Sequence, residues 1–230
     1  CAGPGNPPCV VDETAHVDRA GRDIVRSSSF DNNLICILEK EVFAVASIAD
    51  RLKEAMCANG AVEVKGSDLQ RLEKLVVAED GAHPAKDWVG KDAAKIARAA
   101  GINVPESTRL LLAEVDAMHP FVQAELLMPV LGFVRVPNVD EAIACALQAE
   151  HGFGHTATMH STNIDNLSRM ARAVNTSIFV KNGGALAGLG VDGEGYTSFT
   201  IASPTGEGIT TALSFTRERR CSLKDSFRIV

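Results

Sequence analysis

Apolar residues occur along this chain in two spacings that alternate almost from end to end. Short, nearly continuous apolar runs, the pattern of strands buried on both faces, occupy residues 9–11, 42–48, 108–115, 130–138, 155–161 and 176–182. Apolar residues at helical spacing occupy residues 17–25, 49–60, 67–77, 91–102, 139–150 and 163–174. Strands that alternate with helices predict an α/β fold with a largely parallel sheet covered by helices.

Three regions depart from this alternation. Residues 78–90 are polar and predict the least regular part of the body, and residues 183–208 are rich in glycine. Residues 209–230 predict one or two extended segments that leave the body. Among the local signals, Ser67 is predicted to cap the helix over 67–77, and Gly60 to end the helix over 49–60.

The glycine-rich region contains a literal Gly-x-Gly-x-x-Gly at residues 188–193. This motif binds dinucleotides when it follows a strand and opens a helix. Here residues 194–204 follow, and they are rich in Thr and Ser with strand character. We therefore expect a glycine-rich loop on the substrate side of the fold rather than a nucleotide site.

Composition and charge narrow the class of protein. The chain has 230 residues, 46% of them hydrophobic and 23% charged, which is ordinary for a globular domain with a sizeable core. Its net charge is −6 and the charges are interspersed, so nucleic acid and anionic membrane are poor partners. No apolar run approaches a membrane span, and the first residues lack a signal-peptide pattern. These features predict a cytosolic protein.

The cysteines favour reduced thiols over a disulfide framework or a metal site. They show neither a Cys-x-x-Cys pair nor zinc-ligand spacing with histidine, and they stand at positions 1, 9, 36, 57, 145 and 221. His155 and His160 are five residues apart on a predicted strand, so they point to opposite faces and are expected to be core or edge residues. No metal is expected.

Among the cysteines, Cys36 is the one that we predict to be reactive, although a buried structural role is the more common one for such a residue. Isolated cysteines in cytosolic proteins are most often buried filler, and Cys36 stands between two isoleucines. The polar run Asp31-Asn32-Asn33 precedes it, however, and asparagine suits a turn or a helix N-cap. Such a cap would place Cys36 in a first helical turn, where the backbone dipole favours the thiolate.

Several motifs together carry a resemblance to a known family. They are "AGPGNPP" at 2–8, "FDNNLIC" at 30–36, "ELLMPVLGFVRVPNVDEAI" at 125–143, "MHSTNIDNL" at 159–167, "TSIFVKNG" at 176–183 and the closing "FRIV". Their order and spread over the whole chain resemble the CoA-acylating aldehyde dehydrogenases of ethanolamine and propanediol utilisation. The resemblance implies an aldehyde dehydrogenase catalytic domain over residues 1–230, with a terminal segment at about 209–230 in oligomer contacts. It also implies that the family's nucleotide-binding domain is not in this chain.

The resemblance assigns a covalent mechanism to Cys36. Its thiolate attacks a short aldehyde such as propionaldehyde or acetaldehyde, hydride passes to NAD, and the resulting thioester transfers its acyl group to coenzyme A. Phe30, at a position that many relatives fill with an aromatic residue, and Asn33 are expected in the substrate pocket. The Cys36 N–H is expected to stabilise the oxyanion together with an asparagine from the nucleotide-binding domain.

The resemblance also points to cofactor contacts. Glu125 and Pro129 match the family's Glu-x-x-x-Pro motif, whose glutamate is expected to bind the nicotinamide ribose. Hydrolytic relatives commonly carry phenylalanine at the position of Leu127, so the contact with the cofactor is expected to differ there.

Two other functions stay open on the sequence. A hydrolytic dehydrogenase would need a general base, and aligning Asn6-Pro7 with the hydrolytic pattern puts Cys1 where that glutamate stands, which favours the acylating reaction. A non-catalytic assembly domain with an inert Cys36 is the other alternative. The expected protein is a homo-oligomer in the cytoplasm, with the interior of a bacterial microcompartment as the alternative location.

Overall fold

The strands form one parallel sheet. The computed structural model describes residues 4–194, 198 and 210–224. Within them, seven strands lie in the order β3-β4-β5-β2-β1-β6-β7, and every neighbouring pair is parallel. The strands are β1 (Pro8–Val11), β2 (Glu41–Val45), β3 (Ala61–Glu63), β4 (Leu110–Glu114), β5 (Val130–Val136), β6 (Thr156–His160) and β7 (Ile178–Lys181). The predicted α/β class and parallel sheet are confirmed.

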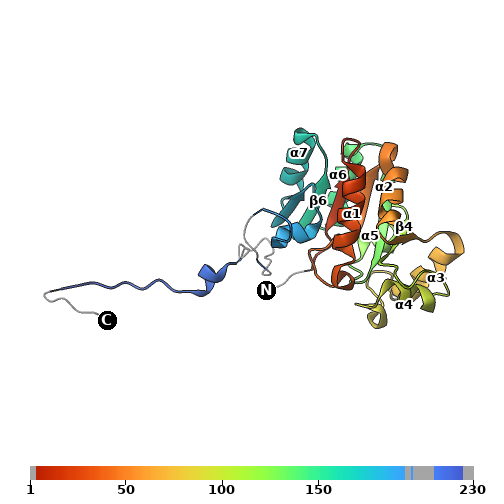
Figure 1. Ribbon diagram of the computed structural model, residues 1–230, viewed down its shortest axis with the longest axis horizontal. Coiled ribbons are helices and arrows are strands. Elements are labelled where there is room, and N and C mark those ends of the chain that lie inside the picture. The colour runs from red at the N-terminus through yellow and green to blue at the C-terminus, as the bar shows by residue number, and fades with distance from the viewer. Residues whose placement is uncertain (1–3, 195–197, 199–209, 225–230) are drawn as a thin grey trace.

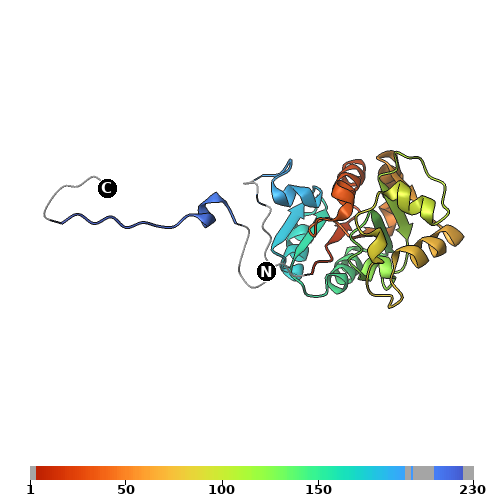
Figure 2. The same cartoon turned by 90° about the horizontal axis from the view of Figure 1, so that it is seen from below.

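Helices cover both faces of the sheet (Figure 1). The α-helices are α1 (Val17–Ser28), α2 (Ala46–Ala58), α3 (Gly66–Val76), α4 (Ala93–Ala99), α5 (Pro120–Gln123), α6 (Val139–Ala149) and α7 (Ile164–Val174). Short 3-10 turns are η1 (Phe30–Asn33), η2 (Lys86–Trp88), η3 (Ala185–Leu189) and η4 (Ala212–Phe215). Figure 2 shows the red α1 on one face of the sheet and the green α6 on the other.

Alternate residues of the strands build two cores. In β1, Cys9 and Val11 pack under α1 and α2, whereas Val10 packs under α6 and α7. A third cluster lies between β4 and the helices α3 and α4. The strands β1, β2, β4, β5 and β6 are thus buried on both faces, which is why their sequences are apolar without a polar alternation.

Three differences from the sequence expectation affect how the elements are read. The strand expected over 42–48 ends at Val45, and α2 begins at once at Ala46. The helix expected to begin with a Ser67 cap instead begins at Gly66, with Lys65 at the N-cap position and no capping hydrogen bond from its side chain. The short strand β3 was not predicted, because its three residues are too few to show a pattern.

The glycine-rich region turns back against β7 rather than opening a helix. Residues 185–189 form η3, and Gly190 adopts a left-handed conformation with φ 91°. A Cβ on Gly188 would lie 2.4 Å from Ile178 Cγ2, so this glycine allows η3 to pack on β7. Most of residues 194–204 lie outside the described residues, and the expectation of strand character there is untested.

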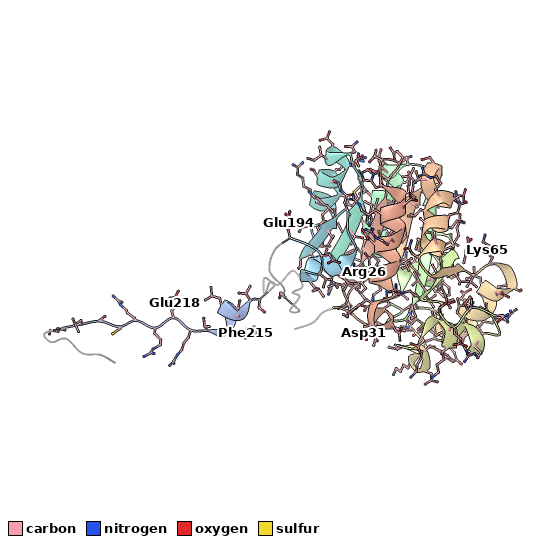
Figure 3. The ribbon with its side chains drawn as sticks, viewed as in Figure 1. Arg26, Asp31, Lys65, Glu194, Phe215 and Glu218 are labelled. Atoms are coloured by element: carbon pink, nitrogen blue, oxygen red, sulfur yellow. The ribbon has the colours of Figure 1, made fainter. Side chains whose placement is uncertain are left out.

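Residues 212–224 are exposed along their length and run away from the α/β body. Phe215 and Glu218 lie on this outlying segment in Figure 3, far from the side chains of the body. This agrees with the extended segment expected from the sequence, although residues 225–230, with the closing "FRIV", lie outside the described residues. Among the described residues, no helix is long and apolar enough to cross a membrane.

Candidate active site

The candidate site lies at the edge of the sheet where the parallel strands begin. Cys36 stands five residues before β2, Glu125 five residues before β5, and His155 directly before β6. Gly5 lies three residues before β1. Because β5, β2, β1 and β6 are consecutive in the sheet, their approach segments meet at one place. Open parallel sheets usually bind ligands at the opposite, carboxyl edge, so strand order alone would have suggested the wrong end.

The loop that carries Cys36 has an unusual backbone. Asp31, Asn32 and Asn33 have φ values of 47°, 51° and 62°, three consecutive residues in the left-handed region. Aspartate and asparagine tolerate this region better than other non-glycine residues, which explains the composition of the run. Figure 3 shows Asp31 just beyond the lower end of α1, where the loop begins. Such backbone strain persists only where surrounding contacts hold it.

Asn33 supplies much of that support. Its side chain is buried, and its Nδ2 donates hydrogen bonds to the Ser28 carbonyl at 2.7 Å and to the Glu39 carbonyl at 3.0 Å. These bonds tie the end of α1 to the approach to β2. Asn33 therefore holds the loop closed, and its assignment to the substrate pocket stays a prediction. Phe30, the other predicted pocket residue, is 47% exposed.

Cys36 lies in a turn and not in a helix, which corrects the expectation of a first helical turn. The next regular element after η1 is β2, which begins at Glu41. The thiol is partly buried. Burial and the charge of Glu125 raise the pKa of Cys36 above its ordinary value, and the charge of Lys40 opposes this rise. In place of a helix dipole, a buried lysine is the group that favours the thiolate.

Lys40 was missed by the sequence reading. It is 4% exposed, and burial lowers its pKa to about 8 against the raising effects of Glu125 and Cys36. Its Nζ donates to Asn33 O at 3.0 Å, to Asn33 Oδ1 at 2.5 Å and to Ile35 O at 3.2 Å. The available signal was a lysine at the start of a strand buried on both faces, where a charge needs partners.

Glu125 closes the site from the β5 side. Its carboxylate accepts a hydrogen bond from the Gly5 N–H, and burial raises its pKa while Lys40 opposes the rise. Leu127 takes a left-handed φ of 54°, and its carbonyl accepts from Gly90 N at 2.9 Å. The carbonyl of Pro129 accepts from Leu111 N at 2.9 Å, which begins the pairing of β4 with β5. The roles of Glu125, Leu127 and Pro129 in cofactor binding stay predictions.

His155 is buried as expected, but it lies beside the loop that carries Cys36. A Cβ on Gly5 would lie 3.1 Å from His155 Cγ and 3.3 Å from the Cys36 carbonyl oxygen, so Gly5 separates the two residues closely. Burial and the charge of Lys40 both lower the pKa of His155. His160 lies at the other end of β6, which agrees with the expectation that the two histidines do not pair. His155 and Cys36 are far apart in the sequence. They lie close together because the strands that follow them, β6 and β2, both neighbour β1 in the sheet.

The chain matches known proteins over most of its length. The model of the aldehyde dehydrogenase family matches residues 2–191. The chain belongs to the aldehyde dehydrogenase family. It is 54% identical over 233 residues to the acetylating acetaldehyde dehydrogenase EutE of Salmonella typhimurium, a match that covers 100% of this chain and 50% of the relative. The family resemblance read from the sequence is confirmed.

Two solved structures of this family share the fold closely. Propionaldehyde dehydrogenase of Rhodopseudomonas palustris, with bound CoA and an acylated cysteine, has a TM-score of 0.91 and 52% identity over 96% of this chain and 51% of that chain. A propionaldehyde dehydrogenase from the fucose utilisation microcompartment of Clostridium phytofermentans has a TM-score of 0.90 and 43% identity over 98% of this chain and 52% of that chain. The chain thus spans about half the length of these aldehyde dehydrogenases.

Proposed function

We propose that this chain is the thiol-bearing catalytic domain, residues 1–230, of a CoA-acylating aldehyde dehydrogenase that acts on acetaldehyde or propionaldehyde. The observation that carries the proposal is the position of Cys36 in a strained loop beside the buried cation Lys40. The chain is also 52% identical in sequence to an enzyme whose structure contains bound CoA and an acylated cysteine. A core cysteine would need neither the strained backbone nor the charge.

The chemistry follows from the geometry of Cys36. Its thiolate sulfur adds to the aldehyde carbon, and the carbonyl electron pair moves to the oxygen, which the Cys36 N–H stabilises. NAD, which Glu125 would hold in our proposal, would supply the hydride acceptor. Loss of the hydride from that carbon lets the C=O bond re-form as a thioester on Cys36. The thiol of coenzyme A then adds to the thioester and the Cys36 thiolate leaves, which yields acyl-CoA.

The side chain of Glu125 is chemically suited to bind the ribose of the nicotinamide cofactor. It is a partly exposed carboxylate at the mouth of the Cys36 loop, and a carboxylate accepts hydrogen bonds from vicinal hydroxyl groups. Leu127 and Pro129 fix the backbone that follows it. The assignment of Cys1 to the position of a hydrolytic glutamate lies outside the described residues, so the choice between CoA and water rests on the relatives.

The outlying segment supports association of subunits. Leu213, Phe215 and Leu223 are 78%, 77% and 61% exposed, and apolar side chains on an extended segment gain stability by packing on a partner. We propose a homo-oligomer in the cytoplasm, within a bacterial microcompartment as for the Clostridium phytofermentans relative. A Phe215→Ser variant should shift the mass measured by light scattering toward the monomer; an unchanged mass would contradict a role of this residue in assembly.

Peptide-mapped mass spectrometry after incubation with propionyl-CoA tests the activity. The reverse half-reaction should place a propionyl group on Cys36, and Cys36→Ser should abolish it. Iodoacetamide labelling should be faster at Cys36 than at the exposed Cys57 and Cys221. No adduct together with slow labelling of Cys36 would favour the non-catalytic assembly domain, and loss of the adduct to water in the presence of CoA would favour the hydrolytic enzyme.

A further inference from the structure

The ammonium group of Lys40 has a fixed position in the nucleophile loop. A lysine has three N–H donors, and here they match three acceptors: the Asn33 carbonyl, the Asn33 Oδ1 and the Ile35 carbonyl. The residue is 4% exposed, so the charge is held inside the protein and does not swing into water. Hydrogen bonds from a charged donor are stronger than those between neutral groups.

These bonds explain how the loop keeps its shape. Three successive left-handed residues end at Asn33, and this strain directs the carbonyl groups of Asn33 and Ile35 to one point. Carbonyl oxygens brought together repel one another unless a cation lies between them. Lys40 is that cation, and it comes from the approach to β2, four residues after Cys36.

One of these bonds acts directly on the nucleophile. The Ile35 carbonyl and the Cys36 N–H belong to the same planar peptide unit, so a partner that fixes the oxygen also fixes the direction of the N–H. A charged donor on the oxygen polarises the unit and makes its N–H a stronger donor. The Cys36 N–H is the group that faces the oxyanion in the proposed reaction.

The charge of Lys40 also balances the acids around it. The groups that face it are Cys36, Glu39, Glu41 and Glu125, and His155 on the β6 side. Without Lys40, the charge of Glu125 would act on the thiol unopposed, and a negative charge disfavours a thiolate. The nucleophile therefore depends on a cation that never needs to touch the substrate.

From this geometry we infer that Lys40 is a positioning residue for Cys36, which fixes the Cys36 N–H through the Ile35 carbonyl and holds a positive charge beside the sulfur. The inference rests on the proposed function of Cys36 as nucleophile. It adds a role for a residue that lies outside the cofactor and substrate contacts predicted above.

The test is the pH dependence of Cys36 alkylation by iodoacetamide, followed by peptide mapping. Lys40→Gln keeps donors but loses the charge, and it should slow Cys36 labelling about tenfold at pH 7, where Lys40 is charged, with a smaller difference above the lysine pKa of about 8. Lys40→Arg keeps the charge and should react at pH 7 at a rate near that of the wild type. Lys53→Gln is the matched control, because Lys53 is also nearly buried but acts on Cys57 and not on Cys36.

The outcomes separate the two hypotheses. An unchanged labelling rate at pH 7 in Lys40→Gln, with fast wild-type labelling, would overturn the role of Lys40 and leave the nucleophile intact. Wild-type Cys36 that reacts no faster than Cys57 would instead count against the proposed function. Thermal unfolding of each variant shows whether it is folded. If Lys40→Gln is not folded, Lys40→Arg decides, since about tenfold slower labelling at pH 7 in that charged variant would contradict the inference.

Discussion

Glu39 is a buried carboxyl group whose proton should control stability near neutral pH. It is 0% exposed, and its Oε1 accepts a hydrogen bond from Ala185 N at 2.7 Å. Its Oε2 is buried without a hydrogen-bond partner among the described residues. Burial raises its pKa to about 7, against the lowering effects of the Ser27 hydroxyl and the charge of Lys40. The folded chain thus holds this proton more tightly than the unfolded chain does.

The sign and size of the effect follow from linkage. A carboxyl group with a raised pKa stabilises the fold fully below its unfolded pKa of 4.5, and this contribution is lost as the pH rises through about 7. The gap between 4.5 and about 7 corresponds to about 3 kcal/mol. Glutamine has nearly the same shape and stays neutral at every pH. Glu39→Gln should therefore be more stable than the wild type at pH 8, by up to about 3 kcal/mol, and differ by under about 1 kcal/mol at pH 5.

Urea unfolding followed by far-UV circular dichroism at pH 5 and pH 8 measures this difference. Glu54→Gln, at an exposed position on α2, is the matched control and should show the same stability relative to the wild type at both pH values. The reasoning would be refuted by a Glu39→Gln variant whose stability relative to the wild type is the same at pH 5 and pH 8. That result would mean that Glu39 is ionised in the folded chain throughout this range.

Two further substitutions test the packing. Gly188→Ala should lower the free energy of unfolding by about 1–3 kcal/mol, because its Cβ would lie 2.4 Å from Ile178 Cγ2. Gly183→Ala is the control, since its Cβ would meet only ordinary contacts at 3.5 and 3.6 Å; equal thermal midpoints for the two variants would contradict this account. Asp12→Ala should cost about 3–5 kcal/mol, because this buried carboxylate accepts hydrogen bonds at the ends of β1 and β6, including Ser161 Oγ at 2.6 Å. A loss under about 1 kcal/mol in urea unfolding would show that those donors find other partners.

The sequence predicted most of the fold because strands and helices leave local signals. Six of the seven strands have apolar runs at the predicted places, and the helices between them show their apolar stripes. The prediction was wrong where an element is very short or where one apolar run belongs to two elements. The strand β3 has only three residues, and the apolar run over 42–48 continues from β2 into α2. An apolar run indicates that its residues are buried, but it does not indicate where one element ends and the next begins.

The sequence by itself also determined the family and the candidate nucleophile, since the Asp-Asn-Asn run and Cys36 are adjacent in the chain. Only the tertiary structure decided what surrounds Cys36. Glu125 and His155 are about 90 and 120 residues away along the chain, and they reach the site because β5, β2, β1 and β6 begin side by side. Strand order depends on how all the elements pack together, and no local spacing encodes it. Lys40 is only four residues from Cys36 in the chain, but its burial beside the thiol, in place of a helix dipole, depends on how the surrounding elements pack.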